Sequence, residues 1–261
     1  MKARVIKIGG NELDQPAFLT RLAQEVRAIG EPVVMVHGGG RAIADLQARL
    51  GLAAVKVEGL RVTDPDSLWA AEMVLSGSTN KRLVAALVTA GVDALGLSGV
   101  DRGLLRCEQK VHPTADLGLV GEIVQVRTEV LTGLLAAGVS PVVSPISLGL
   151  DGRTYNVNAD TAAAVVAQAL GAELLDFVSN VPGVLVEGRV CAGLTAAEAE
   201  GLIAAGVIRE GMVPKVRAAL AALAEGVQRA RIVDLNGLAA GGGTVFSAVE
   251  RGDGVMDGGE Q

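Results

Sequence analysis

The chain has 261 residues, of which half are hydrophobic but only 2% are aromatic, and its formal net charge at pH 7 is −6. This length suits one large α/β unit or two lobes that share a sheet, with roughly 70–75% of the unfolded surface buried. The acidic balance and the scarcity of aromatic stacking platforms argue against a nucleic-acid partner, because phosphate neutralisation needs a basic surface.

The cysteines and the apolar stretches indicate a cytoplasmic protein. Cys107 and Cys191 lie far apart and outside any Cys/His cluster, so reduced thiols are expected and a zinc site is not. The N-terminus, MKARVIKIGG, carries charge where a signal peptide needs an apolar segment. Residues 130–150 are uncharged, but glycines and prolines interrupt them, which predicts a helix, a turn and a strand instead of a membrane span.

Short apolar runs alternate with amphipathic segments along the chain. The runs predict buried strands at 5–8, 32–36, 92–97, 139–144, 174–179 and 231–233. Helical spacing predicts helices near 14–29, 41–50, 66–77, 79–90, 128–137, 158–170, 195–205 and 213–225. A β-hairpin is expected within 104–126, and the polar tail RGDGVMDGGEQ is expected to fray. The alternation predicts a three-layer α/β/α sandwich with a mostly parallel central sheet.

In such sheets ligands bind at the carboxyl ends of the strands. The first predicted strand carries Lys7 in an otherwise apolar run, just before Gly9 and Gly10. A buried lysine costs roughly several kcal/mol unless it is paired or reaches water. Lys7 is therefore either a snorkelling lysine on an edge strand or a cation that points at an anion, which the two glycines would admit close to the backbone.

A second glycine corner follows the next strand, in VMVHGGGRAIADL. Gly38, Gly39 and Gly40 stand where a helix begins, so free N–H groups could face an anion there. The alternative is tight packing between the strand and the helix. The P-loop signature, with its lysine, is absent.

Two later segments place polar side chains beside predicted helices. In GLRVTD, Arg61 is suited to bidentate capture of a carboxylate, although a lone loop arginine is usually only solvated. In NVNAD, Asn156 and Asn158 share one face of an extended segment and Asp160 follows in the first helical turn. Helix capping explains Asn158 and Asp160 by themselves, but the three side chains together resemble the floor of a polar pocket.

The last candidates lie near the C-terminal third of the chain. In FVSNVPGVL a buried strand breaks at Ser179 and Asn180 and turns through Pro182 and Gly183. In REGMVPKVRAAL, Lys215 sits in the first turns of a helix, where a cation opposes the helix dipole. A negative group near Lys215 would explain this choice.

Taken together, in this order and at this spacing, these segments resemble the amino acid kinase family over almost the whole chain. The matching blocks are KIGG (7–10), VHGGG (36–40), GLRVTD (59–64), NKRL (80–83), GLSG (96–99), NVNAD (156–160), SNVPGV (179–184) and GMVPKV (211–216). The resemblance implies the amino acid kinase fold. It also implies transfer of the γ-phosphoryl group of ATP to the γ-carboxylate of N-acetyl-L-glutamate, a step of arginine biosynthesis.

The resemblance also implies roles for individual residues. Lys7 and Lys215 would stabilise the transferring phosphoryl group, and Asp160 would orient both lysines. Gly9 and Gly10 would approach the phosphate. The acetylated amino acid would be held by Gly38, Gly39, Arg61, Asn156 and Asn158. The nucleotide would be flanked by Ser179, Asn180, Val181, Pro182, Gly183, Val184, Val207, Ile208 and Arg209. Its phosphates would carry Mg²⁺, with no metal ligand supplied by the protein.

Two lobes are implied, with acceptor binding and dimerisation in residues 1–172 and ATP binding in residues 173–261. A carboxylate nucleophile is already ionised at pH 7, so phosphoryl transfer to it needs no general base. This accounts for a site without a catalytic histidine. The chain begins a few residues before its first strand and lacks the additional N-terminal helix of the arginine-inhibited hexamers, which implies an arginine-insensitive homodimer.

Two alternatives remain open. Many relatives with this activity carry aspartate where this chain has Asn180. Asparagine there resembles the related kinase of the lysine pathway, which phosphorylates an α-aminoadipate derivative. A non-catalytic amino-acid sensor on the same fold is the second alternative, and the presence of Lys7, Asp160 and Lys215 argues against it.

Overall fold

The structure is a computed structural model that describes residues 3–10 and 12–248. Its centre is an eight-stranded sheet in the order β14-β16-β15-β11-β1-β2-β8-β5. The strands are β1 (Arg4–Ile8), β2 (Val34–His37), β5 (Ala94–Ser98), β8 (Ser140–Ser144), β11 (Leu174–Val178), β14 (Gly193–Thr195), β15 (Arg229–Val233) and β16 (Thr244–Ser247). Neighbouring strands run parallel except β15 and β16. The expected mostly parallel sheet is confirmed.

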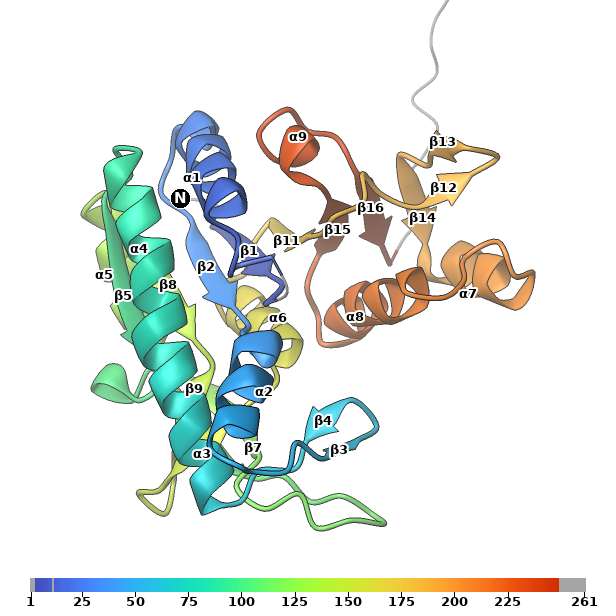
Figure 1. The fold of residues 1–261 in the computed structure, drawn as a ribbon. Helices are drawn as coiled ribbons and strands as arrows, with labels where there is room; N and C mark the ends of the chain where they lie inside the picture. Colours follow the sequence, from blue (N-terminus) through green and yellow to red (C-terminus); the bar gives the residue numbers. More distant parts are fainter. Residues whose placement is uncertain (1–2, 11, 249–261) are drawn as a thin grey trace, which may run out of the picture.

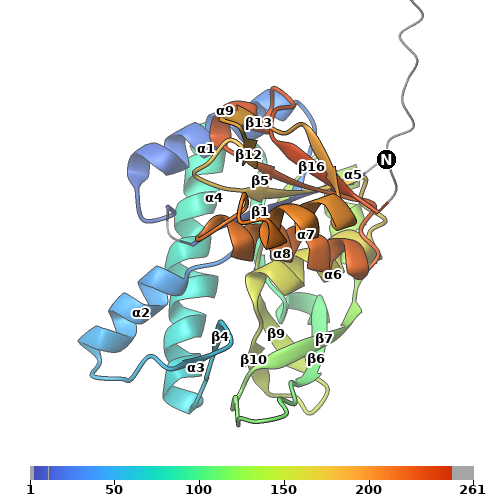
Figure 2. The ribbon, with the colours of Figure 1, turned by 90° about the vertical axis from the view of Figure 1, so that its right-hand side faces the viewer.

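Helices cover both faces of this sheet (Figures 1 and 2). One face packs against α5 (Thr128–Ala136), α6 (Ala159–Ala169), α7 (Ala196–Ala204) and α8 (Met212–Ala224). The other packs against α1 (Pro16–Ile29), α4 (Asn80–Thr89) and α9 (Leu235–Leu238). Each interface is a separate cluster of buried apolar side chains, which gives the three layers that the sequence predicts.

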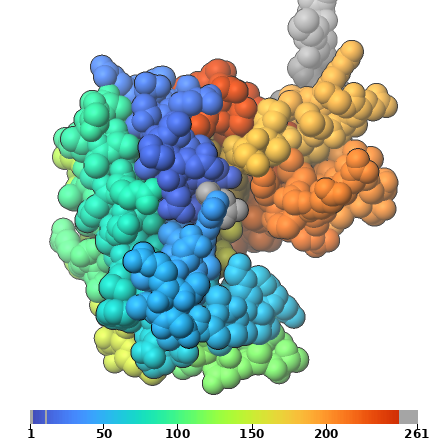
Figure 3. All heavy atoms as spheres, viewed as in Figure 1, coloured from blue at the N-terminus to red at the C-terminus, as the bar shows by residue number. Residues whose placement is uncertain are grey.

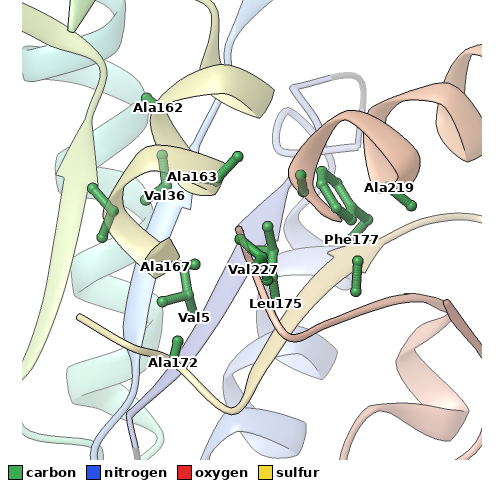
Figure 4. Close-up of a cluster of buried hydrophobic side chains, with 14 of the residues drawn as sticks. Val5, Val36, Ala162, Ala163, Ala167, Ala172, Leu175, Phe177, Ala219 and Val227 are labelled. Atoms are coloured by element: carbon green, nitrogen blue, oxygen red, sulfur yellow. The ribbon is translucent and has the colours of Figure 1, made fainter. Parts of the chain in front are cut away.

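Strand alternation decides which side chain faces which layer. In β1, Val5 lies in the cluster under α6 and α8, whereas Ile6 and Ile8 lie in the cluster under α1 and α4. Lys7 is therefore on the α6 side. Alanines of α6, including Ala162 and Ala163, pack against this face of the sheet (Figure 4), so a core with few aromatic residues is filled by close approach of helix and sheet.

A second group of elements extends below the carboxyl ends of β1 and β2 (Figures 1 and 2). It contains α2 (Gly40–Arg49), the hairpin of β3 (Lys56–Val57) and β4 (Leu60–Arg61), and α3 (Pro65–Glu72). A four-stranded sheet completes it, in the order β10 (Thr154–Asn156), β9 (Ile146–Gly149), β6 (Leu105–Gln109) and β7 (Gly121–Val126). The antiparallel pair β6–β7 confirms the expected hairpin.

The two helices expected at 66–77 and 79–90 are one continuous helical run. A π-helical segment, Met73–Thr79, joins α3 to α4 without a break. The sequence SGS at 76–78 suggested an interruption, but Val74 and Leu75 are buried in a third apolar cluster with Ile43 of α2. This packing holds the segment helical despite its weak local propensity.

Several short elements were not predicted. They are the strands β3, β4, β9, β10, β12 (Leu185–Val186), β13 (Arg189–Val190), β14 and β16, and the helix α9. Two to four residues are too few to establish a period. The expected division at residue 172 stays a prediction, and β1 pairs directly with β11 across it. The tail RGDGVMDGGEQ lies outside the described residues.

None of the helices in the described ranges is both long enough and apolar enough to cross a membrane. Cys107 and Cys191 are both free thiols, as expected.

Candidate active site

Three loops leave the sheet side by side. In the register of the parallel strands, Ile8 of β1 is level with His37 of β2 and with Val178 of β11. The glycine pairs after β1 and β2 and the Ser-Asn turn after β11 therefore start at the same edge. The chain builds one half of the sheet from β2 to β8 and the other from β11 onward, so β1 is the switch point at which ligands bind in such sheets.

Lys7 reaches this edge and is paired there. Its Nζ lies 2.7 Å from Oδ1 of Asp160 in the first turn of α6, with 15% and 38% of the two side chains exposed. Because β1 is hydrogen-bonded on both sides, the edge-strand alternative for Lys7 is wrong. The lysine instead extends to the carboxyl end of the strand and forms an ion pair with Asp160.

Lys215 approaches the same place from α8. Its Nζ donates to Oγ of Ser179 at 2.6 Å and to Oδ1 of Asn180 at 2.9 Å. Burial lowers the pKa of Lys215 and the charge of Lys7 adds to this effect, while the carboxylate of Glu12 opposes it. Asp160 pairs with Lys7, whereas the turn after β11 holds Lys215. The expectation that Asp160 orients both lysines therefore stays a prediction for Lys215.

The two glycine corners touch each other through their backbones. A Cβ on Gly10 would lie 2.5 Å from the nitrogen of Gly39, and a Cβ on Gly39 would lie 2.7 Å from Cδ2 of Leu75. Tight packing therefore accounts for Gly10 and Gly39, whereas a Cβ on Gly40 would meet nothing within 4 Å. In the described part of the chain no acceptor takes the N–H of Gly10 or Gly39. Both groups are therefore free to donate to an anion, and anion binding at this corner stays a prediction.

Arg61 is buried, with 8% of its surface exposed. It donates to Oε1 of Gln47, and its Nη2 donates to the Gly40 carbonyl at 2.9 Å. Burial lowers its pKa, yet none of the carboxylates in the described ranges pairs with it. A buried guanidinium without a carboxylate leaves room for an anionic ligand.

The two asparagines are held in different ways. Asn158 caps α6, since its Oδ1 accepts from the N–H groups of Asp160 at 2.8 Å and Thr161 at 3.1 Å. Asn156 donates through Nδ2 to Oγ1 of Thr63 at 3.2 Å. The capping explanation for Asn158 is thus correct, and both asparagines also line one cavity, as the shared face predicted.

Two adjacent cavities meet at the lysine–aspartate pair. The first, of about 250 Å³, is lined on its polar side by Lys7, Gly10, Gly38, Gly39, Gly40, Lys56, Arg61, Asn156, Asn158 and Asp160. The second, of about 240 Å³, is lined by residues including Lys7, Gly9, Gly10, Glu12, Asp160, Ser179 and Lys215. Lys7, Gly10 and Asp160 belong to both. Figure 3 shows the surface hollowed between the blue N-terminal segments and the orange α8.

The other residues expected around a nucleotide lie outside these two cavities. They are Asn180, Val181, Pro182, Gly183, Val184, Val207, Ile208 and Arg209. Val184 and Ile208 are core residues, with 1% and 3% of their surfaces exposed, so almost none of either residue is accessible to a ligand. Val207 is 42% exposed.

Two charged residues of the cavities were not predicted. Glu12 lines the second cavity and is the negative group near Lys215 that the sequence suggested without identifying it. Lys56 lines the first and is the cross-strand partner of Arg61 in the β3–β4 hairpin. The turn of that hairpin, Glu58–Gly59, has positive φ at both residues. Glu-Gly is a weaker signal for such a turn than the preferred Asn-Gly or Asp-Gly pairs.

The described residues contain no group of three or more His, Cys, Asp or Glu side chains placed to hold a metal ion.

A profile of the amino acid kinase family matches residues 2–234. Acetylglutamate kinase from Roseiflexus sp. (strain RS-1) is 56% identical over 246 residues, with 94% of each chain covered. Acetylglutamate kinase from Chloroflexus aurantiacus (strain ATCC 29366 / DSM 635 / J-10-fl) is 54% identical, with 91% of this chain and 94% of that protein covered.

Solved structures agree with the sequence relatives. The structure of smu.665 from Streptococcus mutans UA159 superposes with a TM-score of 0.76 at 30% identity, covering 95% of this chain and 99% of that one. N-acetylglutamate synthase from Neisseria gonorrhoeae, in complex with coenzyme A and N-acetyl-glutamate, gives a TM-score of 0.80 at 26% identity, covering 96% of this chain and 60% of that one. On its fold, its sequence profile and these relatives, the chain belongs to the amino acid kinase family.

Proposed function

We propose that the protein is an acetylglutamate kinase, which transfers the γ-phosphoryl group of ATP to the γ-carboxylate of N-acetyl-L-glutamate in arginine biosynthesis. The observation that carries the proposal is the pair of cavities that share Lys7, Gly10 and Asp160. One cavity offers a buried arginine and two asparagines, and the other offers Lys215. The relatives named acetylglutamate kinase support the choice of acceptor.

The first cavity suits an N-acylated amino acid with two carboxylates. Arg61 supplies two-point hydrogen bonding to an α-carboxylate, and Asn156 supplies an amide for the acetamido group. The γ-carboxylate would then lie at the shared end of the cavity, where the N–H groups of Gly10 and Gly39 are free of acceptors in the described structure. Gly38, Gly39 and Asn158 would complete the wall of this acceptor site.

The second cavity suits the phosphates of ATP. The γ-carboxylate oxygen attacks the γ-phosphorus, an oxygen–phosphorus bond to the acceptor forms, and the bond to the ADP oxygen breaks. Lys7 from β1 and Lys215 from α8 both line this cavity and would neutralise charge on the transferring group, with the glycine N–H groups as further donors. Mg²⁺ carried by the nucleotide phosphates supplies further charge neutralisation when bound.

The aminoadipate alternative is weakened by the place of Asn180. This residue accepts a hydrogen bond from Lys215 and does not line the first cavity. An asparagine here therefore affects the site for the ATP phosphates and does not select for the chain length of the acceptor. The sensor alternative would require loss of a phosphate-binding lysine, and both lysines are in place. A homodimer that works in the cytoplasm, with ATP bound between the Ser179–Val184 turn and the segment 207–209, completes the proposal.

Truncation of the two lysines tests the assignment. Lys7→Ala and Lys215→Ala each remove a cation that acts on the transition state, so kcat should fall on the order of 10²–10³-fold, with a much smaller change in the KM for N-acetylglutamate. Lys110→Ala removes an exposed lysine paired with Glu122 and serves as the matched control. Near wild-type kcat in either site variant would contradict the proposed roles.

A further inference from the structure

Three of the sequence blocks that resemble the family meet behind the glycine corner, on the side away from the cavities. VHGGG contributes His37, NKRL contributes Asn80 and GLSG contributes Gly96. His37 and Asn80 are fully buried, with 0% of their surfaces exposed, and neither lines the two cavities. His37 therefore cannot touch a substrate, and whatever it does must act through the residues that it contacts.

The imidazole of His37 has two defined partners. Its Nδ1 lies 3.1 Å from the carbonyl oxygen of Gly38, and its Nε2 lies 3.1 Å from Nδ2 of Asn80. A carbonyl oxygen can only accept, so a hydrogen bond with Gly38 requires the proton to be on Nδ1. The orientation of Asn80 then decides what Nε2 does.

Asn80 is oriented by groups whose roles are unambiguous. Its Nδ2 lies 2.9 Å from the carbonyl oxygen of Val142, so this atom is the amide nitrogen, and its Oδ1 accepts from Nζ of Lys81 at 3.2 Å. For the second hydrogen of Nδ2, His37 Nε2 at 3.1 Å is a closer acceptor than the carbonyl oxygen of Leu97 at 3.5 Å. Nδ2 therefore donates to His37 Nε2, which must be unprotonated. A side chain on Gly96 would overlap Oδ1 of Asn80, which explains the glycine in GLSG.

The Gly38 carbonyl is linked to the cavity by the geometry of the peptide bond. In a trans peptide the C=O and the following N–H point in opposite directions. A carbonyl held by His37 therefore turns the N–H of Gly39 away from the histidine. The nitrogen of Gly39 faces Gly10. Because Gly10 has no side chain, the Gly39 N–H stays open to the cavity that both glycines line.

We propose that His37 is a positioning residue for phosphoryl transfer. As the neutral Nδ1–H tautomer, fixed by Asn80, it holds the Gly38 carbonyl and so aims the Gly39 N–H at the transferring group. The inference rests on the proposed function for the identity of that group. The tautomer of His37 and its hydrogen bonds to Gly38 and Asn80 do not depend on the proposed function.

Side-chain replacements separate positioning from packing. His37→Asn places an amide N–H close to the position of Nδ1 and can keep the bond to Gly38, whereas His37→Leu cannot. We expect kcat to fall on the order of 10–100-fold in His37→Leu, because a misplaced donor costs rate even when binding is retained. The KM for ATP should stay within about threefold, and His37→Asn should recover most of the lost kcat.

A matched control measures the cost of a damaged core alone. Leu87→Ala empties a fully buried position two turns along α4 from Asn80 and should leave kcat per folded molecule within about twofold of wild type. Equal losses in His37→Asn and His37→Leu, or wild-type kcat in a folded His37→Leu protein, would overturn the proposal.

Nitrogen-15 NMR of the imidazole provides a readout that needs no substrate. The chain contains two histidines, so His37→Asn assigns the signals directly. At pH 7 we expect the Nδ1–H tautomer for His37, and an Nε2–H tautomer would overturn the proposal. If the wild-type enzyme failed to phosphorylate N-acetylglutamate, the proposed function would fall, while the tautomer would still report on the network.

Discussion

At the scale of single residues, the site brings partly buried charges of both signs close together. Lys7 and Lys215 enter from β1 and α8, and each is held by a different partner, Asp160 for the first and the Ser179–Asn180 turn for the second. Like charges brought together in a half-buried place repel one another, and burial with this repulsion lowers the pKa of Lys215. A nucleotide's phosphates would remove that repulsion.

His37 makes the stability of the protein depend on pH. Burial lowers its pKa from 6.5 to about 4, against the weaker opposing effect of the Gly38 carbonyl. Between these values the unfolded chain binds a proton that the folded chain does not, so stability is complete above pH 6.5 and falls as the pH drops toward 4. From pH 7 to pH 5 the loss should be about 2 kcal/mol.

Urea unfolding of wild type and His37→Asn at pH 7 and pH 5 checks this loss. The asparagine variant has no group that titrates at this position, so its stability should change less between the two pH values. The remaining carboxylates and His112 are common to both proteins and cancel in the comparison. The same pH dependence in both proteins would show that His37 does not titrate as described.

The charged residues were the part of the site most open to sequence reasoning. Lys7 is a charged side chain in an apolar strand, and Lys215 is a cation near the N-terminus of a helix, where the helix dipole disfavours positive charge. Residues that conflict with such local preferences often indicate function. Glu12 and Lys56 violate no such rule, since an acid in a loop and a lysine in a short hairpin are ordinary surface residues. Their place in the cavities follows from the tertiary fold.

At the scale of elements, the glycine corners work as a pair of interlocked turns. The Gly10 corner and the Gly38–Gly40 corner approach each other so closely that a side chain on Gly10 would meet the backbone of Gly39 and Gly40 at 2.5–2.8 Å. On the other side, Gly39 rests on Leu75 of the π-helical segment. π-Helical turns are frequent at functional sites, and this one ends at Thr79, directly before Asn80.

Gly10→Ala should be far more damaging than Gly38→Ala. The first puts a methyl group against backbone that cannot move aside, so we expect a loss of about 1–3 kcal/mol of stability and a large loss of kcat. Gly38→Ala places the methyl group in ordinary van der Waals contact, 3.6 Å from the Gly10 nitrogen and 3.7 Å from the Ala159 Cβ. Thermal unfolding and initial rates on both variants check the difference, and equal behaviour would contradict the interlocking.

The helices and strands differ in how well the sequence pattern predicted them. Long periodic segments such as α1 and α6, and apolar runs such as β1 and β11, were predicted within a few residues of their bounds. The π-helical join at 73–79 was not, because a change in backbone hydrogen bonding leaves no side-chain period in the sequence. The short strands β14 and β16 were missed for the same lack of a period.

At the scale of the whole molecule, a buried ionic cluster joins three strands of the central sheet. Asp176 of β11 accepts from Arg4 of β1 at 2.7 Å and from Arg231 of β15 at 2.6 Å, and its side chain is fully buried. Both arginines also donate to the carbonyl oxygen of Leu238. The cluster thus connects the strand that carries Lys7 with the C-terminal half of the sheet.

Asp176→Ala should destabilise the protein by about 3–5 kcal/mol, because it leaves two arginines without their buried counter-charge. Glu129→Ala, which breaks an exposed ion pair with Arg127, should cost at most about 1 kcal/mol. Chemical denaturation of both variants measures the two losses. Similar small effects would show that the cluster contributes little to holding the two halves together.

The order of the strands was beyond pattern reasoning. Alternating runs predicted a mostly parallel sheet with helices on both faces, and the resemblance to a family predicted the fold. Neither composition nor period tells which strand lies beside β1, because apolar side chains in buried strands are interchangeable partners. The meeting of Lys7, Asp160 and Lys215 depends on that order, so only the folded chain brings the site together.

The measurement that tests the central claim most directly is acyl phosphate formation with defined acceptors. The wild-type protein, ATP and Mg²⁺ are combined with N-acetyl-L-glutamate, L-glutamate or N-acetyl-L-α-aminoadipate. ADP release is followed together with trapping of the acyl phosphate by hydroxylamine. The account predicts equal amounts of ADP and hydroxamate with N-acetyl-L-glutamate, and a kcat/KM well above those of the other two acceptors. A higher kcat/KM for the aminoadipate derivative, or no acceptor-dependent hydroxamate, would contradict it.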